Sequence, residues 1–256
     1  MKDSQHSNDF LVESQGSVSD PILNHPHRAV PNPVDGSLLV DPEIVLKALG
    51  MGLTIEFFYS STSTRNDQFG KNRSASVNAY VIPDPEFGGL SVWRGNEKAF
   101  AWSVFMTIGG ITYYTPSTGT YSPTTMTYNG TSYTEQFPDG SQLQYETQNA
   151  GAYLLTRAIA PAGPRQTFTY GTGAEVGLLK TIQVTDGRKV TFTYSASSPT
   201  SLLSSVQDWG GRFWTFQYDT NRQLTTMSTP LGCQTGFSYA TFSGATRLSG
   251  ISDPAG

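Results

Sequence analysis

The stretch GRKVTFTYSASSPTSLLSSVQ, residues 187–207, decides the fold of this chain. It starts at a glycine and runs into residues 189–194, where apolar Val190 and Phe192 alternate with polar neighbours. Alternation with a period of two predicts a β-strand with one buried face. A polar loop and a second short strand, 203–207, complete a hairpin. Since a lone hairpin is only marginally stable in water, this unit needs neighbours of its own kind.

The unit recurs through the second half of the chain, and the same residue types return at matching positions of each copy. Each copy has a turn glycine, a Phe-x-Tyr pair whose tyrosine lies seven residues after that glycine, a leucine, and another apolar residue three positions after the leucine. The turn glycines are Gly163, Gly187, Gly211 and Gly232, with Gly256 opening a further copy, and the tyrosines are Tyr170, Tyr194, Tyr218 and Tyr239. The leucines are Leu179, Leu203, Leu224 and Leu248. Repeats of this length bury their apolar columns against each other. The sequence therefore predicts an all-β fold of stacked β-hairpin repeats forming a curved sheet.

The chain divides into three expected regions. Residues 1–30 are polar and predict a disordered leader, residues 31–137 a β-rich lead-in, and residues 138–256 the hairpin repeats. The repeat units are expected near 138–159, 160–183, 184–207, 208–228 and 229–252.

Local signals within the lead-in predict its elements. Alternation from Leu53 to Tyr59 favours a strand, and Gly109-Gly110 between apolar runs favours a hairpin turn. Asn129-Gly130 favours a two-residue type I′ turn. A capping Asp41, a following Pro42 and a terminating Gly50 predict a short helix between them.

Composition narrows the classes of function. The formal net charge is −4, the charged fraction is 14%, and no Lys or Arg occurs between Lys98 and Arg157. This argues against a nucleic-acid partner, which needs clustered basic residues. The sequence has no apolar run long enough to span a bilayer and no secretory signal, so no membrane insertion is expected.

The second half also carries a recognisable motif set. It consists of Gly211-Arg212, Tyr218-Asp219, Arg222-Gln223-Leu224 and Ile251-Ser252-Asp253-Pro254-Ala255-Gly256. This pattern resembles the RHS/YD-repeat family over about residues 31–256, most strongly over 160–256. The chain departs from the family where Tyr170, Tyr194 and Tyr239 are followed by Gly171, Ser195 and Ala240 in place of Asp.

The resemblance implies a sheet that spirals into a hollow shell, in a bacterial protein that is secreted or exposed at the cell surface. Some members of this family enclose a C-terminal toxin, which this chain does not contain, and others are thought to bind carbohydrate. The resemblance therefore implies an extracellular or cell-surface location, and the rest of a longer parent chain as a partner.

The residue types used in catalysis are sparse. All three histidines, including His25 and His27, lie in the leader, and Cys233 is the one cysteine. Asp186, Asp208 and Asp253 sit at equivalent turns, where they either accept hydrogen bonds from their own backbone or form paired carboxylates of a glycan-active enzyme. No catalytic residue, metal site or cofactor is expected.

Tryptophans are the candidate ligand contacts. Trp93, Trp209 and Trp214 are expected to stack on sugar rings if they are exposed, and otherwise to fill the core. The leading hypothesis is a non-enzymatic shell segment of a larger protein, which encloses cargo or contacts a partner. The alternatives are a carbohydrate-binding module acting through exposed Trp and Tyr, and, ranked third, a glycan-active enzyme.

Overall fold

The computed structural model describes residues 29–31, 37–46, 53–84, 86, 88–95, 99–117, 124–195, 201–242 and 244–252. Its strands run from β1 to β22, and the helical element within these ranges is a single 3₁₀ turn, η1 (Gly173–Glu175). The all-β class predicted from the sequence is confirmed. The expected leader up to residue 28, its histidines, the Asp253 turn and Gly256 lie outside the described residues. No helix within the described ranges is long and apolar enough to cross a membrane.

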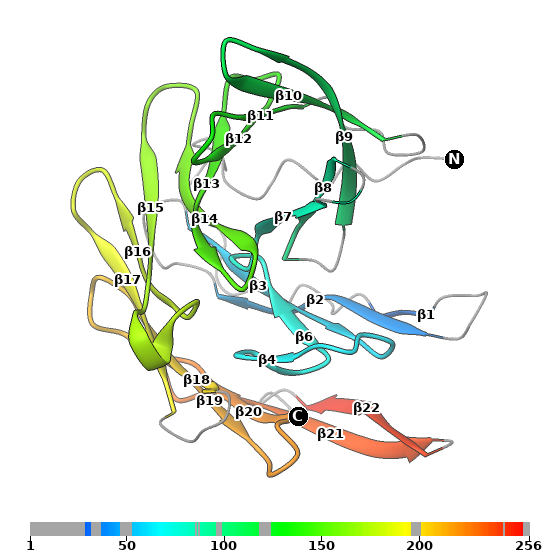
Figure 1. Ribbon diagram of the computed structural model, residues 1–256. Helices are drawn as coiled ribbons and strands as arrows, with labels where there is room; N and C mark the ends of the chain where they lie inside the picture. The colour runs from blue at the N-terminus through cyan, green and yellow to red at the C-terminus, as the bar shows by residue number, and fades with distance from the viewer. Residues whose placement is uncertain are drawn as a thin grey trace.

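A closed ring of strands forms the upper part of the molecule (Figure 1). Its members are β7 (Tyr80–Asp84), β8 (Gly89–Trp93), β9 (Ala99–Ile108), β10 (Ile111–Pro116), β11 (Thr125–Tyr128), β12 (Tyr133–Gln136), β13 (Gln142–Asn149) and β14 (Ala152–Ile159). Each strand pairs with the next in sequence, and β14 returns to β7 through Tyr153↔Val81 and Leu154↔Tyr80. The ring therefore joins the end of the lead-in to the unit expected near 138–159.

The ring encloses apolar side chains and one ion pair. Val92, Trp102, Met126 and Leu143 are buried in it. Arg94 pairs there with the carboxylate of Glu135, which also accepts hydrogen bonds from Thr124 Oγ1 at 3.0 Å and Tyr145 Oη at 3.4 Å. Burial alone would lower the pKa of Arg94, but the charge of Glu135 raises it above its usual value. These partners meet the requirement that a buried charge be paired and hydrogen-bonded.

The repeats continue the same sheet from β14 as a curved band (Figure 1). The band contains β15 (Arg165–Tyr170), β16 (Leu179–Val184), β17 (Lys189–Tyr194), β18 (Leu203–Gln207), β19 (Phe213–Tyr218), β20 (Leu224–Ser228), β21 (Gln234–Phe242) and β22 (Ala245–Ser252). The phenylalanine and leucine columns are buried, and the turn glycines at 163, 187, 211 and 232 all have positive φ. The predicted stacked hairpins are confirmed.

The repeat tyrosine closes a gap between successive hairpins. Strands β16 and β17 pair only over Thr181–Gln183, so the carbonyl of Leu179 lies beyond the ladder. Tyr194 Oη donates to that carbonyl at 2.8 Å, and Tyr170 and Tyr239 make the same bond to Leu155 and Leu224. A register shift directly precedes each repeat tyrosine. The bulge bends the strand, and the tyrosine hydroxyl donates a hydrogen bond to the carbonyl that the ladder leaves unpaired. Together they allow neighbouring hairpins to separate at this end, so that the sheet curves.

We expect Tyr194→Phe to lower the free energy of unfolding by about 1–2 kcal/mol, because the buried Leu179 carbonyl loses its donor. Burial raises the pKa of Tyr194 above its ordinary value, so the hydroxyl remains a donor at neutral pH. Urea denaturation measures the change. Tyr113→Phe, at an exposed position of β10, is the control and should change stability by less than about 0.5 kcal/mol. Equal effects at the two positions would contradict this role.

A small inner sheet lies between the ring and the end of the band (Figure 1). It pairs β1 (Ala29–Pro31), β2 (Leu38–Leu46), β3 (Ile55–Ser60) and β6 (Arg73–Ala75) in that order. Phe57 of this sheet contacts Phe216 of β19 at 5.3 Å between ring centroids, and Tyr59 Oη accepts a hydrogen bond from Leu248 N at 2.9 Å. The curved repeats thus cover a segment of their own chain.

The helix predicted after Asp41 is wrong. Residues 38–46 form strand β2, and residues 47–50 lie outside the described ranges. Val40, Ile44 and Leu46 are buried, and Ile44 pairs with Phe57 of β3. The register shifts between Val40 and Ile44, where Pro42 falls, because proline has no N–H for a regular ladder. Burial against β3 overrides the local capping signal.

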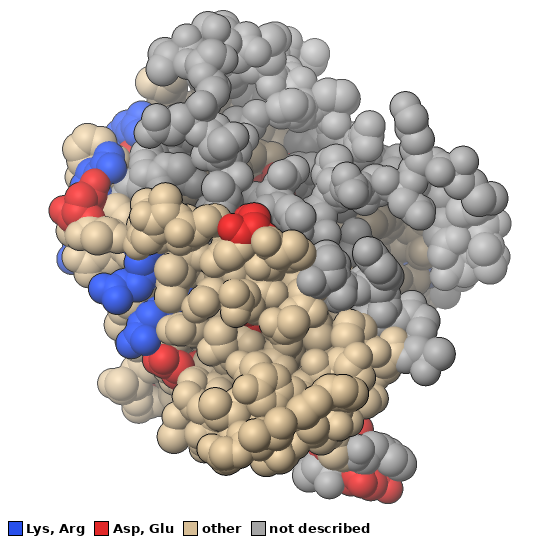
Figure 2. Space-filling model, turned by 90° about the horizontal axis from the view of Figure 1, so that it is seen from above, with Lys and Arg blue, Asp and Glu red and all other residues tan. Residues whose placement is uncertain are grey.

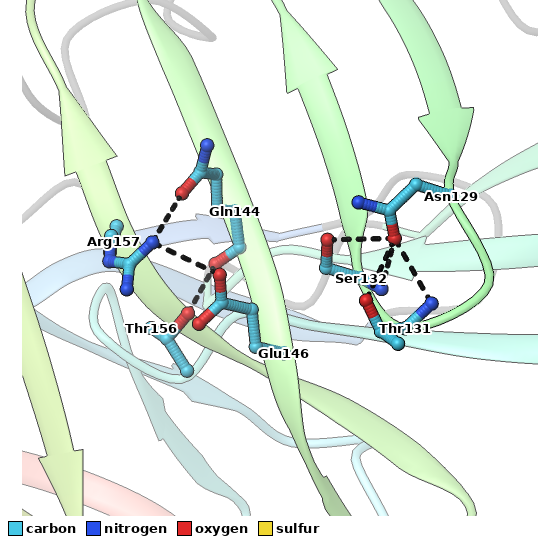
Figure 3. Close-up of polar contacts among 7 residues, drawn as sticks. All are labelled: Asn129, Thr131, Ser132, Gln144, Glu146, Thr156 and Arg157. Carbon is cyan, nitrogen blue, oxygen red and sulfur yellow. Dashed lines mark hydrogen bonds and ion pairs between the residues drawn. The ribbon is translucent and has the colours of Figure 1, made fainter. Parts of the chain in front are cut away.

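The hairpin at Asn129 is confirmed, but its two-residue turn is wrong. Tyr128 pairs with Tyr133, so the loop holds the four residues between them. Asn129 Oδ1 accepts hydrogen bonds from the backbone N–H of Thr131 at 3.0 Å and of Ser132 at 2.9 Å, as Figure 3 shows. This side-chain bridge closes the loop with positive φ at Gly130 and not at Asn129. The predicted Gly109-Gly110 turn is confirmed, with φ of 59° and 81°.

Candidate ligand-binding cleft

Two aromatic residues stand side by side where β7 and β8 join the ring. Tyr80 and Trp93 are directly opposite in the register, and their rings lie 6.1 Å apart at an interplanar angle of 16°. Both residues are half-buried, so part of each side chain remains at the surface. A cross-strand aromatic pair of this kind stabilises the sheet and fixes both rings.

Arg65, in the loop after β3, lies against both rings. Its Cζ atom is 5.3 Å from the centroid of Trp93 and 5.7 Å from that of Tyr80. Its Nη2 donates to Tyr80 Oη at 2.9 Å, and its Nη1 is 3.5 Å from Asp67 Oδ2. Cation–π contact and these polar bonds hold the guanidinium in one place.

The loop and the aromatic pair line an open cleft of about 490 Å³. The lining residues are Ser60, Thr62, Ser63, Thr64, Arg65, Tyr80 and Trp93. Ser60 Oγ and Thr62 Oγ1 are 3.3 Å apart, and Ser63 Oγ accepts a hydrogen bond from Arg65 N at 3.2 Å. The volume falls in the range of small-molecule sites, and hydroxyls beside aromatic rings supply both polar and apolar contacts.

The three tryptophans named from the sequence occupy different environments. Trp93 lines the cleft. Trp209 is 53% exposed in the β18–β19 turn, with Arg188 Cζ 5.4 Å from its ring centroid. Trp214 is only 6% exposed, so it does not meet the condition for stacking on a ligand and fills the core instead, because its position in the β19 alternation turns it inward.

The turn aspartates bond to their own turns. Asp208 Oδ1 accepts from Gly210 N at 2.9 Å and from Arg212 N at 2.8 Å, and Asp186 Oδ1 accepts from Arg188 N at 3.0 Å. Bonding to Arg188 also lowers the pKa of Asp186. Of the two sequence interpretations, the turn role is confirmed for both residues. Cys233 is exposed next to the turn glycine Gly232.

Sequence reasoning identified Trp93 but missed Arg65 and Tyr80 as its neighbours. A usable signal was the run Ser60-Ser61-Thr62-Ser63-Thr64 directly before Arg65, which marks a hydroxyl-rich loop. The position of this loop beside Trp93 results from tertiary packing. The spacing of residues in the sequence does not predict it.

Charged side chains are unevenly distributed over the surface. In the view from above, Lys and Arg gather, with some Asp and Glu, along the side formed by the repeats (Figure 2). Much of the remaining described surface in that view is uncharged. Two basic residues of the repeats, Arg188 and Arg212, are each paired with a turn aspartate.

Comparison with known proteins shows a distant likeness to a solved structure. No family model matches the chain, and no curated protein matches it. Among solved structures, the chain is similar to the N-terminal domain of effector protein SpvB from Salmonella typhimurium strain LT2, with a TM-score of 0.44 and 13% identity. The match covers 83% of this chain and 98% of that chain. The fold described above rests on the strands and registers of this chain alone.

Proposed function

We propose that this chain is a non-enzymatic shell segment of a larger secreted or cell-surface protein, built from RHS/YD-type repeats. The observation that carries the proposal is the way the curved band covers other segments of the same chain. Its buried face contacts the inner sheet through Phe216 and Leu248. Its backbone contacts the short hairpin of β4 (Asn66–Asp67) and β5 (Gly70–Lys71), where Leu203 N donates to Gln68 O at 2.8 Å.

The repeat residues support a structural role. The hydroxyls of Tyr170, Tyr194 and Tyr239 bind carbonyls of the preceding hairpin, and the turn aspartates bind their own backbone. The tyrosines therefore hold one hairpin against the next, and the aspartates hold the turns in shape. A continuous sheet assembled in this way suits the enclosure of cargo or a partner, such as a toxin segment of a longer parent chain.

The first experiment is to measure the intact mass of the protein purified from its source. A mass well above the 27.8 kDa of this chain is expected, with the strands from β11 to β22 resisting limited proteolysis in the native protein. A native mass of 27.8 kDa would overturn the shell proposal and favour a stand-alone binding module.

The second candidate function is carbohydrate binding, which the Trp93 cleft favours. Sugar rings present an apolar face to aromatic side chains and hydroxyls to polar groups. Tyr80 and Trp93 supply the rings, and Ser60, Thr62 and Arg65 supply polar atoms. The exposed Trp209 offers a second, separate contact on the turn edge.

Trp93→Ala is expected to weaken binding of a soluble glycan at least tenfold, because the ligand loses an aromatic surface worth about 1.4 kcal/mol or more. Isothermal titration calorimetry across a glycan panel measures the affinity. Leu231→Ala, at a position that is 79% exposed and outside the cleft lining, is the matched control and should leave that affinity unchanged. If no member of the panel binds the parent protein, the carbohydrate candidate fails.

A further inference from the structure

The β9–β10 hairpin carries the densest group of exposed large apolar side chains in the described structure. Phe105 is 64% exposed, Ile108 62% and Val104 46%. Met106, Ile111 and Tyr113 are exposed beside them. A contiguous group of this kind on a soluble domain marks an interaction surface.

Over part of its length, one edge of this hairpin pairs with no other strand of the described residues. Strand β9 pairs with β8 only from Ala99 to Trp102, although it continues to Ile108. From Ser103 onward its partner is β10 alone, among the residues that the structure describes. Alternate N–H and C=O groups of the segment 103–108 therefore point away from β10 and offer a template for another strand.

The exposed side chains lie on both faces of the hairpin. Met106 pairs with Tyr113 and Ile108 with Ile111, which places these four on one face. The register shifts between Tyr113 and Tyr114, so Val104 pairs with the inward-packed Tyr114 on the other face. A flat partner would cover one face only. A strand added at the edge extends both faces at once and brings cross-strand neighbours to each.

The segment has little protection against such pairing. Free edges are normally guarded by charged residues, proline or bulges. No charged residue occurs between Lys98 and Glu135, and no proline between Ala99 and Thr115. The one guard is the bulge at Phe105, which leaves Met106–Ile108 in regular register.

We propose that a second copy of this chain pairs with this edge, antiparallel and centred on Thr107, so that the two sheets continue into each other. Identical strands that carry a charge bring like charges together when they pair, and this segment carries none. The same patch on both copies gives a closed two-fold interface. Pairing about Thr107 places Met106 opposite Ile108 of the other copy on one face, and joins the exposed Phe105 side chains to the same interface.

Sedimentation velocity of the whole chain tests the pairing. The parent protein is expected to dimerise, and Phe105→Lys and Thr107→Lys are each expected to raise the dissociation constant at least tenfold. Phe213→Lys, at a 46% exposed position of β19, is the matched control and should leave dimerisation unchanged. A parent that stays monomeric at high concentration overturns the proposal, and so does a dimer that both β9 variants leave intact.

A cysteine at position 107 locates the interface. With Cys233→Ser removing the native thiol, Thr107→Cys is expected to form a disulfide-linked dimer on mild oxidation, because opposed Cα atoms of antiparallel strands lie about 4.5–5.5 Å apart. Thr193→Cys, exposed on β17, should remain monomeric under the same treatment. Equal cross-linking at both positions would show random collision and would overturn the assignment of the interface to β9.

Discussion

Arg73→Met is expected to lower the free energy of unfolding by about 3–5 kcal/mol, because it leaves the buried carboxylate of Glu43 without a partner. Both side chains are fully buried. Arg73 Nε is 2.7 Å from Glu43 Oε2, and Arg73 Nη2 is 2.5 Å from Glu43 Oε1. This two-point geometry joins β6 to β2 at the centre of the inner sheet.

The same guanidinium connects the inner sheet to the last repeat. Its Cζ atom is 5.1 Å from the ring centroid of Tyr59, 5.5 Å from that of Phe237 and 5.6 Å from that of Tyr239. Burial alone would lower the pKa of Arg73, but the charge and hydrogen bonds of Glu43 raise it above its usual value. Removing Arg73 therefore loosens β2 and β3 of the inner sheet together with β21, which comes much later in the sequence.

Urea denaturation followed by circular dichroism measures this loss. The double variant Arg73→Met with Glu43→Leu removes both charges and should recover much of the stability, since a buried ion pair is often replaceable by apolar residues. Arg157→Met breaks the exposed pair with Glu146 shown in Figure 3 and should change stability by less than about 1 kcal/mol. An Arg73→Met loss no larger than this control would contradict the role of the buried pair.

Gly70→Ala is the second large effect, with an expected loss of about 3–4 kcal/mol from strain and steric overlap together. Gly70 has φ of +95°, and a Cβ atom there would lie 2.8 Å from both the carbonyl oxygen of Arg222 and Cε1 of Tyr218. The hairpin of β4 and β5 packs too closely against the repeats for any side chain to fit. A methyl group must push the hairpin away from the band.

Moving the hairpin away would break hydrogen bonds between it and the repeat turn at Arg222. Lys71 N donates to Arg222 O at 2.9 Å, and the Arg222 side chain donates to Asp67 O and to Asn66 Oδ1, both at 2.6 Å. Arg222 itself has φ of +64°, a conformation that favours glycine. Its guanidinium contacts offset that strain by joining the turn to a hairpin more than 150 residues earlier.

Gly163→Ala separates the effect of backbone strain from that of steric overlap. Gly163 has φ of +96°, nearly equal to that of Gly70, but nothing lies within 4 Å of its Cβ position. Its substitution should cost only the backbone strain, about 1–2 kcal/mol. Hydrogen exchange at the amides of Lys71 and Leu203 should quicken in Gly70→Ala and stay unchanged in Gly163→Ala. Equal stability losses would show that the close packing of the hairpin contributes nothing.

The cleft and the ring show what sequence reasoning could not reach. Trp93 was a candidate from its residue type alone, whereas its partners Tyr80 and Arg65 come from a neighbouring strand and a separate loop. Trp214 was a candidate on the same ground, and its residue type alone left open whether it lies on a ligand surface or in the core, where the structure places it. The wrong helix at Asp41 has the same origin, since capping residues describe local preference and β3 supplies the burial that overrides it.

The sequence by itself determined the hairpin units, their turn glycines and their buried columns. These features arise within about 24 residues of chain, where alternation with a period of two and positive φ at glycine leave few other conformations. The tertiary structure alone decided the closure of β14 onto β7, the enclosure of the inner sheet around Arg73 and Glu43, and the edge of β9 that no described strand covers. These three features depend on pairing between residues that are distant in the chain. Their free energy comes from the burial of complementary surfaces, and a local sequence pattern does not indicate which distant segment will be the partner.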